Sequence, residues 1–378
     1  MTRKATWIFP LFAFLQWHCI QSYVSPYKAP ATGYLVVEGY ITSNGPSNFR
    51  LSRSIALPGD STIPVVTGAN LQIEGSDNSV YPLIETGNGG YQLPTASLNT
   101  ATQYRLRISN VNNETYLSDY VPFKPTPPID SVNWISNSSG DSSGVNIYVN
   151  THDPTGNTRY YQWTYNETWE YTSAIQSGLI WLNDSLQFRT AAEQNYVCYH
   201  NDSSSTILVG TTDKLAQDVV YLQPLIFYPV NTQPLAIEYS VLVSQYALTD
   251  SGYNYLSLLK SNTEQLGSIF DPLPAQPGGN LHCLTNPNET VLGYISAGTL
   301  QQQRIYISNR QLPNWEYFPE CYIKDTTVPD IQSAMENFFG EQGYIPIYLN
   351  RGIITANFPS CVDCRTQGGS TTKPSYMP

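Results

Sequence analysis

Residues 160–171 read Tyr160-Tyr-Gln-Trp-Thr-Tyr-Asn-Glu-Thr-Trp-Glu-Tyr171, and this stretch decides the expected fold. Side chains of a β-strand alternate between its two faces, so residues of one parity share a face. Here that face carries Glu167, which we expect at a bend or the rim, and five aromatic residues: Tyr161, Trp163, Tyr165, Trp169 and Tyr171. Leaving such rings in water costs about 25 cal/mol per Å² of apolar surface, which favours a packed β core. The alternative is a stacking platform for sugars or peptides, with four candidate ligand-binding residues: Tyr161, Trp163, Tyr165 and Trp169.

Around this strand, residues 129–365 are expected to form one large β-rich domain. Alternation predicts further strands at 145–149, 219–230 (bent by Pro224) and 235–248, and helical spacing predicts helices near 250–262 and 330–339. Gly340 should stop the second helix. The apolar stripe of this helix should pack on the sheet through Ile331, Ala334, Met335, Phe338 and Phe339. The tail, 366–378, has no periodicity and is expected to lie across the surface.

The preceding region, residues 33–121, consists of short alternating segments with turn signals every 8 to 12 residues or so, as in a β-sandwich. Residues 66–108 resemble the peptidase-regulatory-like sandwiches of exported bacterial proteins, which implies a scaffold without chemistry. Residues 122–128 are rich in proline, which removes backbone donors, so we expect a stiff linker outside any sheet. The predicted fold class is therefore mainly β: an Ig-like or peptidase-regulatory-like sandwich followed by a larger β-rich domain with one or two short helices.

Composition narrows the classes of partner. Of the 378 residues, only 12% are charged, and 18 Lys and Arg against 29 Asp and Glu give a net charge of −11. Such a chain has no basic surface to neutralise phosphates, so nucleic acid is excluded as an expected partner. Uncharged polar groups must instead keep the surface hydrated.

The N-terminus is typical of an export signal. Residues 1–18 combine Arg3 and Lys4 with an apolar run of eleven residues, 5–15, which is shorter than the 20 or so residues that a membrane span needs. Cys19 then stands where a lipoprotein carries its acylated cysteine, although Gln16-Trp-His18 departs from the usual lipobox. We expect a signal peptide over 1–18, lipidation at Cys19 and an anchor linker over 19–32. The alternative is an ordinary cleaved signal that leaves Cys19 unlipidated.

Five further cysteines are candidates for disulfide bonds, since an oxidising compartment favours them: Cys198, Cys283, Cys321, Cys361 and Cys364. Five cannot all pair. Cys361-x-x-Cys364 lacks the second ligand pair of a zinc site and the βαβ setting of a redox motif. We therefore favour a structural bridge from this pair to Cys321 or another distant cysteine, and we expect no metal and no cofactor.

Catalytic patterns are weak. Gly140-Asp-Ser-Ser-Gly144 matches a nucleophile elbow, but a strand follows it where a helix is needed, so we expect a hairpin loop. Glu167 and Glu170 have opposite parity, and a glycosidase pair must flank one bond. We expect no catalytic residues and no enzyme. Hydrolysis would require His152, Glu167 or Glu170 to converge with a nucleophile in one pocket.

Seven short motifs occur in order along the chain: Leu35-Val-Val-Glu-Gly-Tyr-Ile41, Leu51-Ser-Arg-Ser54, Pro127-Pro-Ile-Asp-Ser-Val132, residues 160–170 already quoted, Gly267-Ser-Ile-Phe-Asp-Pro272, Val291-Leu-Gly-Tyr294 and Cys361-Val-Asp-Cys-Arg365. Together they resemble domain-of-unknown-function family 4249, Bacteroidota envelope proteins that are largely predicted outer-membrane lipoproteins. Their genes often lie beside those of TonB-dependent receptors, which implies an accessory part for such a transporter. The family has no established catalytic residues to carry over.

These observations lead to two hypotheses besides hydrolysis. The first is a non-enzymatic outer-membrane lipoprotein that docks on a TonB-dependent β-barrel receptor and helps to capture its substrate. The second is a free-standing envelope module that binds a glycan or a peptide through the aromatic face of residues 160–171. We expect lipid anchoring in the outer membrane, with the facing side left open.

Overall fold

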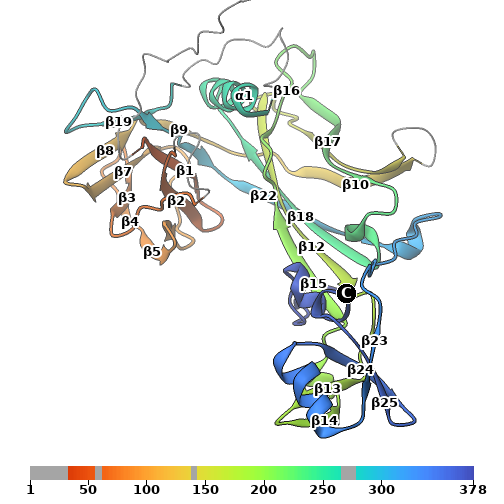
Figure 1. Ribbon diagram of the computed structural model, residues 1–378. Coiled ribbons are helices and arrows are strands. Elements are labelled where there is room, and N and C mark those ends of the chain that lie inside the picture. The colour runs from red at the N-terminus through yellow and green to blue at the C-terminus, as the bar shows by residue number, and fades with distance from the viewer. Residues whose placement is uncertain (1–32, 56–61, 138–142, 265–277) are drawn as a thin grey trace, which may run out of the picture.

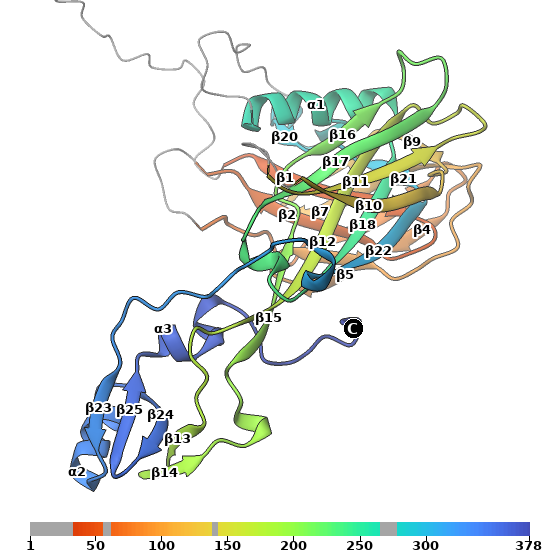
Figure 2. The ribbon, with the colours of Figure 1, turned by 90° about the vertical axis from the view of Figure 1, so that its right-hand side faces the viewer.

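A computed structural model describes residues 33–55, 62–137, 143–264 and 278–378. The protein is mainly β, as the sequence predicted. It has an N-terminal lobe, a middle lobe of two facing sheets, and a small C-terminal lobe at the far end (Figures 1 and 2). No helix within the described ranges is both long and apolar enough to cross a membrane. The predicted signal peptide, Cys19 and the anchor linker 19–32 lie outside the described residues.

The N-terminal lobe is built around one core of alternating apolar side chains, among them Leu35, Val37 and Ile41. Its first nine strands are β1 (Leu35–Thr42), β2 (Ser47–Arg53), β3 (Asn70–Gly75), β4 (Val80–Pro82), β5 (Ile84–Gly87), β6 (Gly90–Leu93), β7 (Gln103–Val111), β8 (Glu114–Ser118) and β9 (Val121–Lys124). The chain later returns to add β19 (Leu281–Cys283), β20 (Val291–Leu292) and β21 (Ser296–Gly298).

The predicted boundary at residue 121 is therefore wrong, because the lobe is completed by residues from much later in the chain. Strands β20 and β21 run parallel to β1, and β21 also pairs with β9, so the returning segment lies between the two. The backbones approach closely there: a Cβ on Gly298 would lie 2.0 Å from the Lys124 carbonyl oxygen. A larger residue at this position would force the strands apart.

The proline-rich segment 122–128 is also not the free linker that we expected. Pro122 lies inside strand β9, which pairs with β7 through only two residues and with β21 through Phe123 and Lys124, so Pro122 has no register partner on β21. Thr126 is buried and hydrogen bonds to Thr299. The segment is thus a packed joint between the two larger lobes.

The middle lobe consists of two sheets that face each other across a shared core. One sheet is β10 (Ile129–Asn137), β11 (Gly144–His152) and β17 (Val219–Pro229). The other is β15 (Val197–Ser203), β12 (Tyr160–Thr172), β18 (Glu238–Ala247) and β22 (Leu300–Ser308), with β16 (Leu208–Thr211) also paired to β12. Strand β17 is irregular at Pro224, as predicted: the register with β11 shifts there. The predicted helix near 250–262 is α1 (Asp250–Glu264).

The C-terminal lobe has its own small cores, so the single domain predicted over 129–365 is two lobes. It contains the hairpin β13 (Leu179–Leu182) and β14 (Ser185–Phe188) and the sheet β23 (Thr326–Pro329), β25 (Ile353–Asn357) and β24 (Ile345–Asn350). The predicted helix near 330–339 is the short α2 (Gln332–Met335), which continues as the π-helical turn η4 (Glu336–Glu341). Gly340 therefore lies inside the turn and does not end it. Met335 and Phe339 pack into the core as predicted, whereas Ile331 is 59% exposed.

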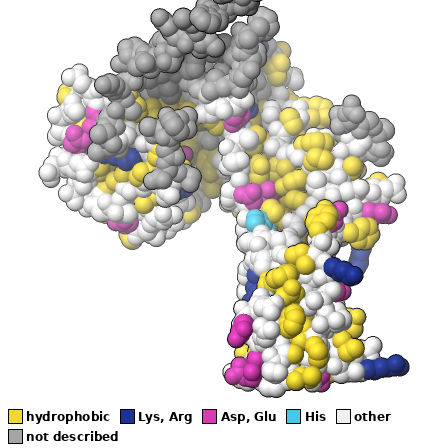
Figure 3. All heavy atoms as spheres, viewed as in Figure 1, with side chains coloured by type: hydrophobic (Ala, Val, Ile, Leu, Met, Phe, Trp, Pro, Cys, Tyr) yellow, Lys and Arg dark blue, Asp and Glu magenta, His cyan; other side chains and the backbone are white. Residues whose placement is uncertain are grey.

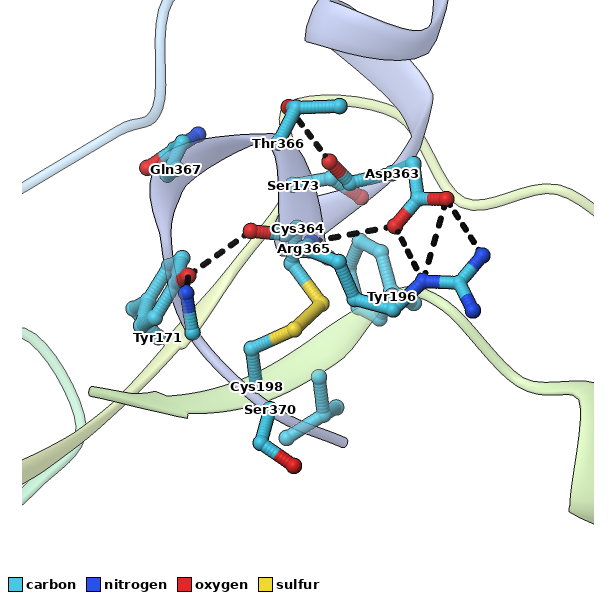
Figure 4. The surroundings of a disulfide bond; sticks show 12 residues. Tyr171, Ser173, Tyr196, Cys198, Asp363, Cys364, Arg365, Thr366, Gln367 and Ser370 are labelled. Atoms are coloured by element: carbon cyan, nitrogen blue, oxygen red, sulfur yellow. Dashed lines mark hydrogen bonds and ion pairs between the residues drawn. A yellow bond between two sulfur atoms is a disulfide. The ribbon is translucent and has the colours of Figure 1, made fainter. Parts of the chain in front are cut away.

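Two disulfides hold the C-terminal segment. Cys198 on β15 pairs with Cys364, and Cys321 pairs with Cys361 on α3 (Pro359–Val362). This confirms that the Cys361-x-x-Cys364 pair bridges to Cys321 and to another distant cysteine. Around the first bridge, the Tyr171 hydroxyl donates to the Cys364 carbonyl oxygen (Figure 4).

The tail beyond Cys364 is docked across the surface, in agreement with its prediction. Ser370 forms a bridge with Tyr199, and the Arg304 guanidinium lies 4.1 Å from the centre of the Tyr376 ring. Met377 is buried. The C-terminus thereby covers part of the five-stranded sheet.

The Cys198–Cys364 bridge should contribute strongly to stability, because its cysteines are 166 residues apart in the sequence. The double variant Cys198→Ala/Cys364→Ala should lose about 2–5 kcal/mol of unfolding free energy, measured by denaturant unfolding. The matched control is Cys283→Ala, which keeps both bridges and should lose about 1 kcal/mol or less. An unchanged unfolding midpoint for the wild type in reductant would contradict this expectation.

Candidate functional site

A cleft of about 680 Å³ lies between the N-terminal lobe and the five-stranded sheet. Its walls come from β1 and the segment 292–296, its floor from β12, β18 and β22, and its roof from α1. Figure 1 shows α1 above β12 and β18, and Figure 3 shows a recess between the N-terminal lobe and the rest of the molecule. The volume lies within the range of about 300–1,000 Å³ that is usual for small-molecule sites.

The floor follows from the alternation of β12. Its odd-numbered residues point into the middle-lobe core, so Gln162, Thr164 and Asn166 point the other way and line the cleft. On β18, Tyr246 pairs with Gln162, and Ser244 pairs with Thr164. On β22, Gln302 lies opposite Ser244 and donates a 2.9 Å hydrogen bond to its hydroxyl.

The wall and roof add tyrosine rings. On β1, Glu38 and Tyr40 face the cleft because Val37 and Ile41 face the N-terminal core. The rings of Tyr40 and Tyr246 lie 4.8 Å apart between centroids, which joins wall to floor. A second tyrosine pair, with centroids 5.6 Å apart, joins the roof to the segment after β20: Tyr255 and Tyr294.

The lining offers hydrogen bonds with little charge. Among the described residues that line the cleft, Glu38 is the one carboxylate, and none is Lys, Arg or His. Burial raises the pKa of Tyr40, Tyr246 and Tyr255 above the ordinary tyrosine value, so these hydroxyls stay neutral and able to donate at physiological pH. The arrangement is suited to holding an uncharged polar molecule.

The aromatic platform predicted on residues 160–171 is wrong as a binding site. Tyr161 and Trp163 are fully buried, Trp169 is 8% exposed, and Tyr165 packs against the same core. The favoured alternative, a core packed on aromatic rings, is confirmed. The physical reason is that the sheet β10-β11-β17 covers this face, which the sequence of β12 alone does not reveal.

Glu167 lies in the middle of that core face, not at a bend or the rim. It is 5% exposed, and its Oε2 accepts hydrogen bonds from the hydroxyls of Tyr228 at 2.6 Å and Tyr239 at 2.5 Å. Burial raises the pKa of Glu167 above its ordinary value, and the two tyrosine hydroxyls offset part of this rise. The carboxyl group is thus a structural member of the core.

The residues considered for hydrolysis do not converge. His152 is exposed at the end of β11, where its Nδ1 lies 2.7 Å from Asp130 Oδ2, a partner that sequence reasoning missed. Glu167 is in the core, and Glu170 points to the opposite face of β12, beside Tyr199. In the loop considered as a nucleophile elbow, Ser142 lies outside the described residues.

Cys283, expected as a disulfide candidate, is instead a buried free thiol. With Glu114 and Glu289 it forms a group whose ligand atoms lie within 4.8 Å of one another. The Tyr116 hydroxyl lies 2.6 Å from Glu114 and 2.9 Å from Glu289, and Arg53 is 3.6 Å from Glu289. Burial raises the pKa of Glu289, whereas hydrogen bonds from Tyr116 and Glu289 lower the pKa of Glu114. The Tyr116 hydroxyl and the Arg53 guanidinium already serve as partners of the two carboxyl groups, and we assign no metal to the group.

Sequence reasoning missed the cleft itself. Its floor residues are the even-numbered positions of the quoted stretch, so the alternation was readable. The wall and roof, however, come from β1 and α1, about 120 residues before and 90 residues after β12. Only the folded chain brings the three together.

The buried carboxyl group of Glu167 generates a pH-dependent prediction. Because the pKa of Glu167 is raised in the folded state, the folded protein favours the protonated carboxyl group. The stability that this group contributes is therefore present at low pH and is lost as the pH rises through the pKa of the folded state. Glu167→Gln should therefore raise the free energy of unfolding at pH 8 by about 1 kcal/mol, and the gain should vanish near pH 4. The control Glu170→Gln, on the opposite face, should leave the pH profile of stability unchanged. A Glu167→Gln variant that is less stable at every pH would contradict the assignment.

Comparisons with known proteins give a family but no function. No curated protein matches the chain. Among solved structures, it is similar to a "Biofilm associated protein - BSP domain", with 8% sequence identity and a TM-score of 0.16 over 77% of this chain and 62% of that one. A likeness of this size supports no inference. The family model described as "Domain of unknown function (DUF4249)" matches residues 22–304, most of the chain. The matched residues contain six of the seven motifs, so the family resemblance is confirmed, and the chain belongs to this family.

Proposed function

We propose that the protein is a non-enzymatic outer-membrane lipoprotein that serves as an accessory subunit of a TonB-dependent β-barrel receptor in nutrient capture or uptake. The observation that carries the proposal is the cleft under α1, whose lining offers amide, hydroxyl and phenol groups with a single carboxylate. Such a lining can orient a ligand through hydrogen bonds. Its hydroxyls would need an adjacent base to act as nucleophiles, and no histidine or lysine is among the described residues that line the cleft.

Two observations, one from the sequence and one from the structure, support export. The N-terminus has the charge and apolar run of a signal peptide, followed by Cys19. The structure adds two disulfides, a type of bond that persists in oxidising compartments and is rare in the cytosol. The receptor as partner rests on what the family resemblance implies.

A second candidate is a free-standing envelope module that binds a glycan or a peptide. The same cleft favours it, because residues of β1, β12, β18, β22 and α1 of this chain already enclose a volume usual for a small-molecule site. The two candidates differ in whether a barrel receptor stays associated with the protein.

Affinity purification of the tagged full chain from detergent-solubilised outer membranes tests the proposal. We expect a β-barrel receptor to be recovered in stoichiometric amount, identified by mass spectrometry. A tagged lipoprotein of the same host, unrelated in sequence, serves as the control for detergent carry-over. Recovery of the protein alone would favour the free-standing module.

The anchor is tested separately. Cys19→Ala should move the protein from the membrane pellet to the soluble fraction, because a lipid chain contributes about 0.8 kcal/mol per buried CH₂ group and the variant has no site for it. Cys283→Ala, which removes the free thiol of the N-terminal lobe, should leave the protein in the pellet. Mass spectrometry of the mature N-terminus should show acyl chains on Cys19, and an unacylated wild type would remove this part of the proposal.

A further inference from the structure

We propose that the cleft under α1 binds a neutral oligosaccharide, laid along the even-numbered face of β12 with its sugar hydroxyls in contact with side-chain amides and hydroxyls. This inference rests on the proposed function, in which the protein captures a ligand, and it names the ligand class.

The charge of the lining excludes acidic ligands. Glu38 is the single carboxylate among the described lining residues. With no Lys, Arg or His among the described lining residues, a uronate, sulfate or phosphate would lose its hydration without gaining a cationic partner. A neutral molecule pays no such penalty.

The hydrogen-bonding groups suit a ligand that both donates and accepts. Gln302 donates to Ser244, and Asn166 donates to Ser203 at 2.8 Å. A side-chain amide has two donor hydrogens and an acceptor oxygen with two lone pairs, so one such bond fixes its orientation and leaves further capacity. Sugar hydroxyls, which donate and accept at the same atom, match this mixed set.

The cleft also has apolar surface for the carbon faces of a sugar ring. Tyr40 and Tyr246 contribute phenol rings to the lining, and Leu256 and Leu259 add aliphatic groups from α1. Tyrosine combines an apolar ring with a polar tip and has few rotatable bonds, so it contributes contact area at little entropic cost. The two rings are held as a pair, which keeps them oriented in the absence of a ligand.

A run of three hydroxyls, Ser204, Ser205 and Thr206, also lines the cleft. The next residue, Ile207, is held against α1: the Lys260 ammonium donates to the Ile207 carbonyl at 2.8 Å, and the Ile207 N–H donates to Glu264 at 2.6 Å. The two bonds fix the end of this run at its junction with β16, so three further hydroxyls are available to a ligand.

A peptide fits the same cleft less well. Extended peptides usually bind by adding a strand to an open sheet edge, where the backbone is unpaired. Strands β1, β12 and β18, which supply most of the cleft, are each paired on both sides. Strand β22, which contributes Leu300 and Gln302 to the lining, lies at one end of its sheet. The cleft therefore offers mainly side-chain groups to a ligand, whereas a peptide that adds to a sheet needs unpaired backbone N–H and C=O groups.

Isothermal titration calorimetry on the full chain, purified in detergent, tests the proposal. The probes are four neutral hexasaccharides (maltohexaose, cellohexaose, mannohexaose and hexa-N-acetylchitohexaose), the acidic hexagalacturonate, and an uncharged hexapeptide of Gly, Ser and Asn with blocked termini. We expect at least one neutral hexasaccharide to bind. Hexagalacturonate and the peptide should show no heat of binding.

Gln302→Ala and Asn166→Ala should each weaken that binding by up to about tenfold, since each removes neutral hydrogen bonds. The matched control is Gln303→Ala on the same strand, whose side chain does not line the cleft and which should bind as the wild type does. Circular dichroism and unfolding midpoints confirm that each variant is folded.

Three results would overturn the inference: no neutral hexasaccharide binding at millimolar concentration, binding that Gln302→Ala and Asn166→Ala leave unchanged, or preferential binding of the peptide or of hexagalacturonate. These outcomes are separate from the receptor purification. A receptor recovered with the protein but no sugar binding would reject the ligand class and leave the accessory role intact.

Discussion

The packing of the aromatic face of β12 against the sheet β10-β11-β17 is the interaction on which the rest of the structure depends. Tyr161 and Trp163 stack with their centroids 5.7 Å apart inside that core. The Trp163 indole donates to Gln245, whose amide in turn donates to the Pro127 carbonyl oxygen in the joint between the lobes. Because a strand has only two faces, burying the odd-numbered residues commits the even-numbered ones to the cleft.

The return of the chain to the N-terminal lobe then fixes the cleft wall against its floor. Strands β20 and β21 are short, yet each pairs with β1, so residues that follow α1 are part of the first lobe's sheet. The Tyr40 hydroxyl donates to the Ala247 carbonyl, and Ala247 donates in turn to Thr126. Two lobes joined by a single segment would be free to hinge. Here the returning strands and the hydrogen bonds through Ala247 connect the lobes at several points and hold them in one arrangement.

Local periodicity explains which features could be predicted. The strands, α1 and the core role of the aromatic residues follow from spacings of two and 3.6 residues that the sequence displays. The failures have long-range causes. Strand β20 is two residues long and pairs with β1 from about 250 positions away, so no local pattern marks it. Glu167 is accommodated in the core only because Tyr228 and Tyr239, distant in sequence, donate to it.

The cleft shows why aromatic residues are ambiguous evidence for a binding site. The most conspicuous rings of the chain are on the side of β12 that is covered, and the open side carries Gln162, Thr164 and Asn166, which attract no attention in a sequence. What the sequence does display is the low charge of the whole chain, 12% of its residues. A surface with few charges must be hydrated by amides and hydroxyls. Where the two lobes and α1 enclose such groups in a cleft, the groups can bind a neutral ligand, whereas an ionic ligand would lose its hydration without a partner of opposite charge.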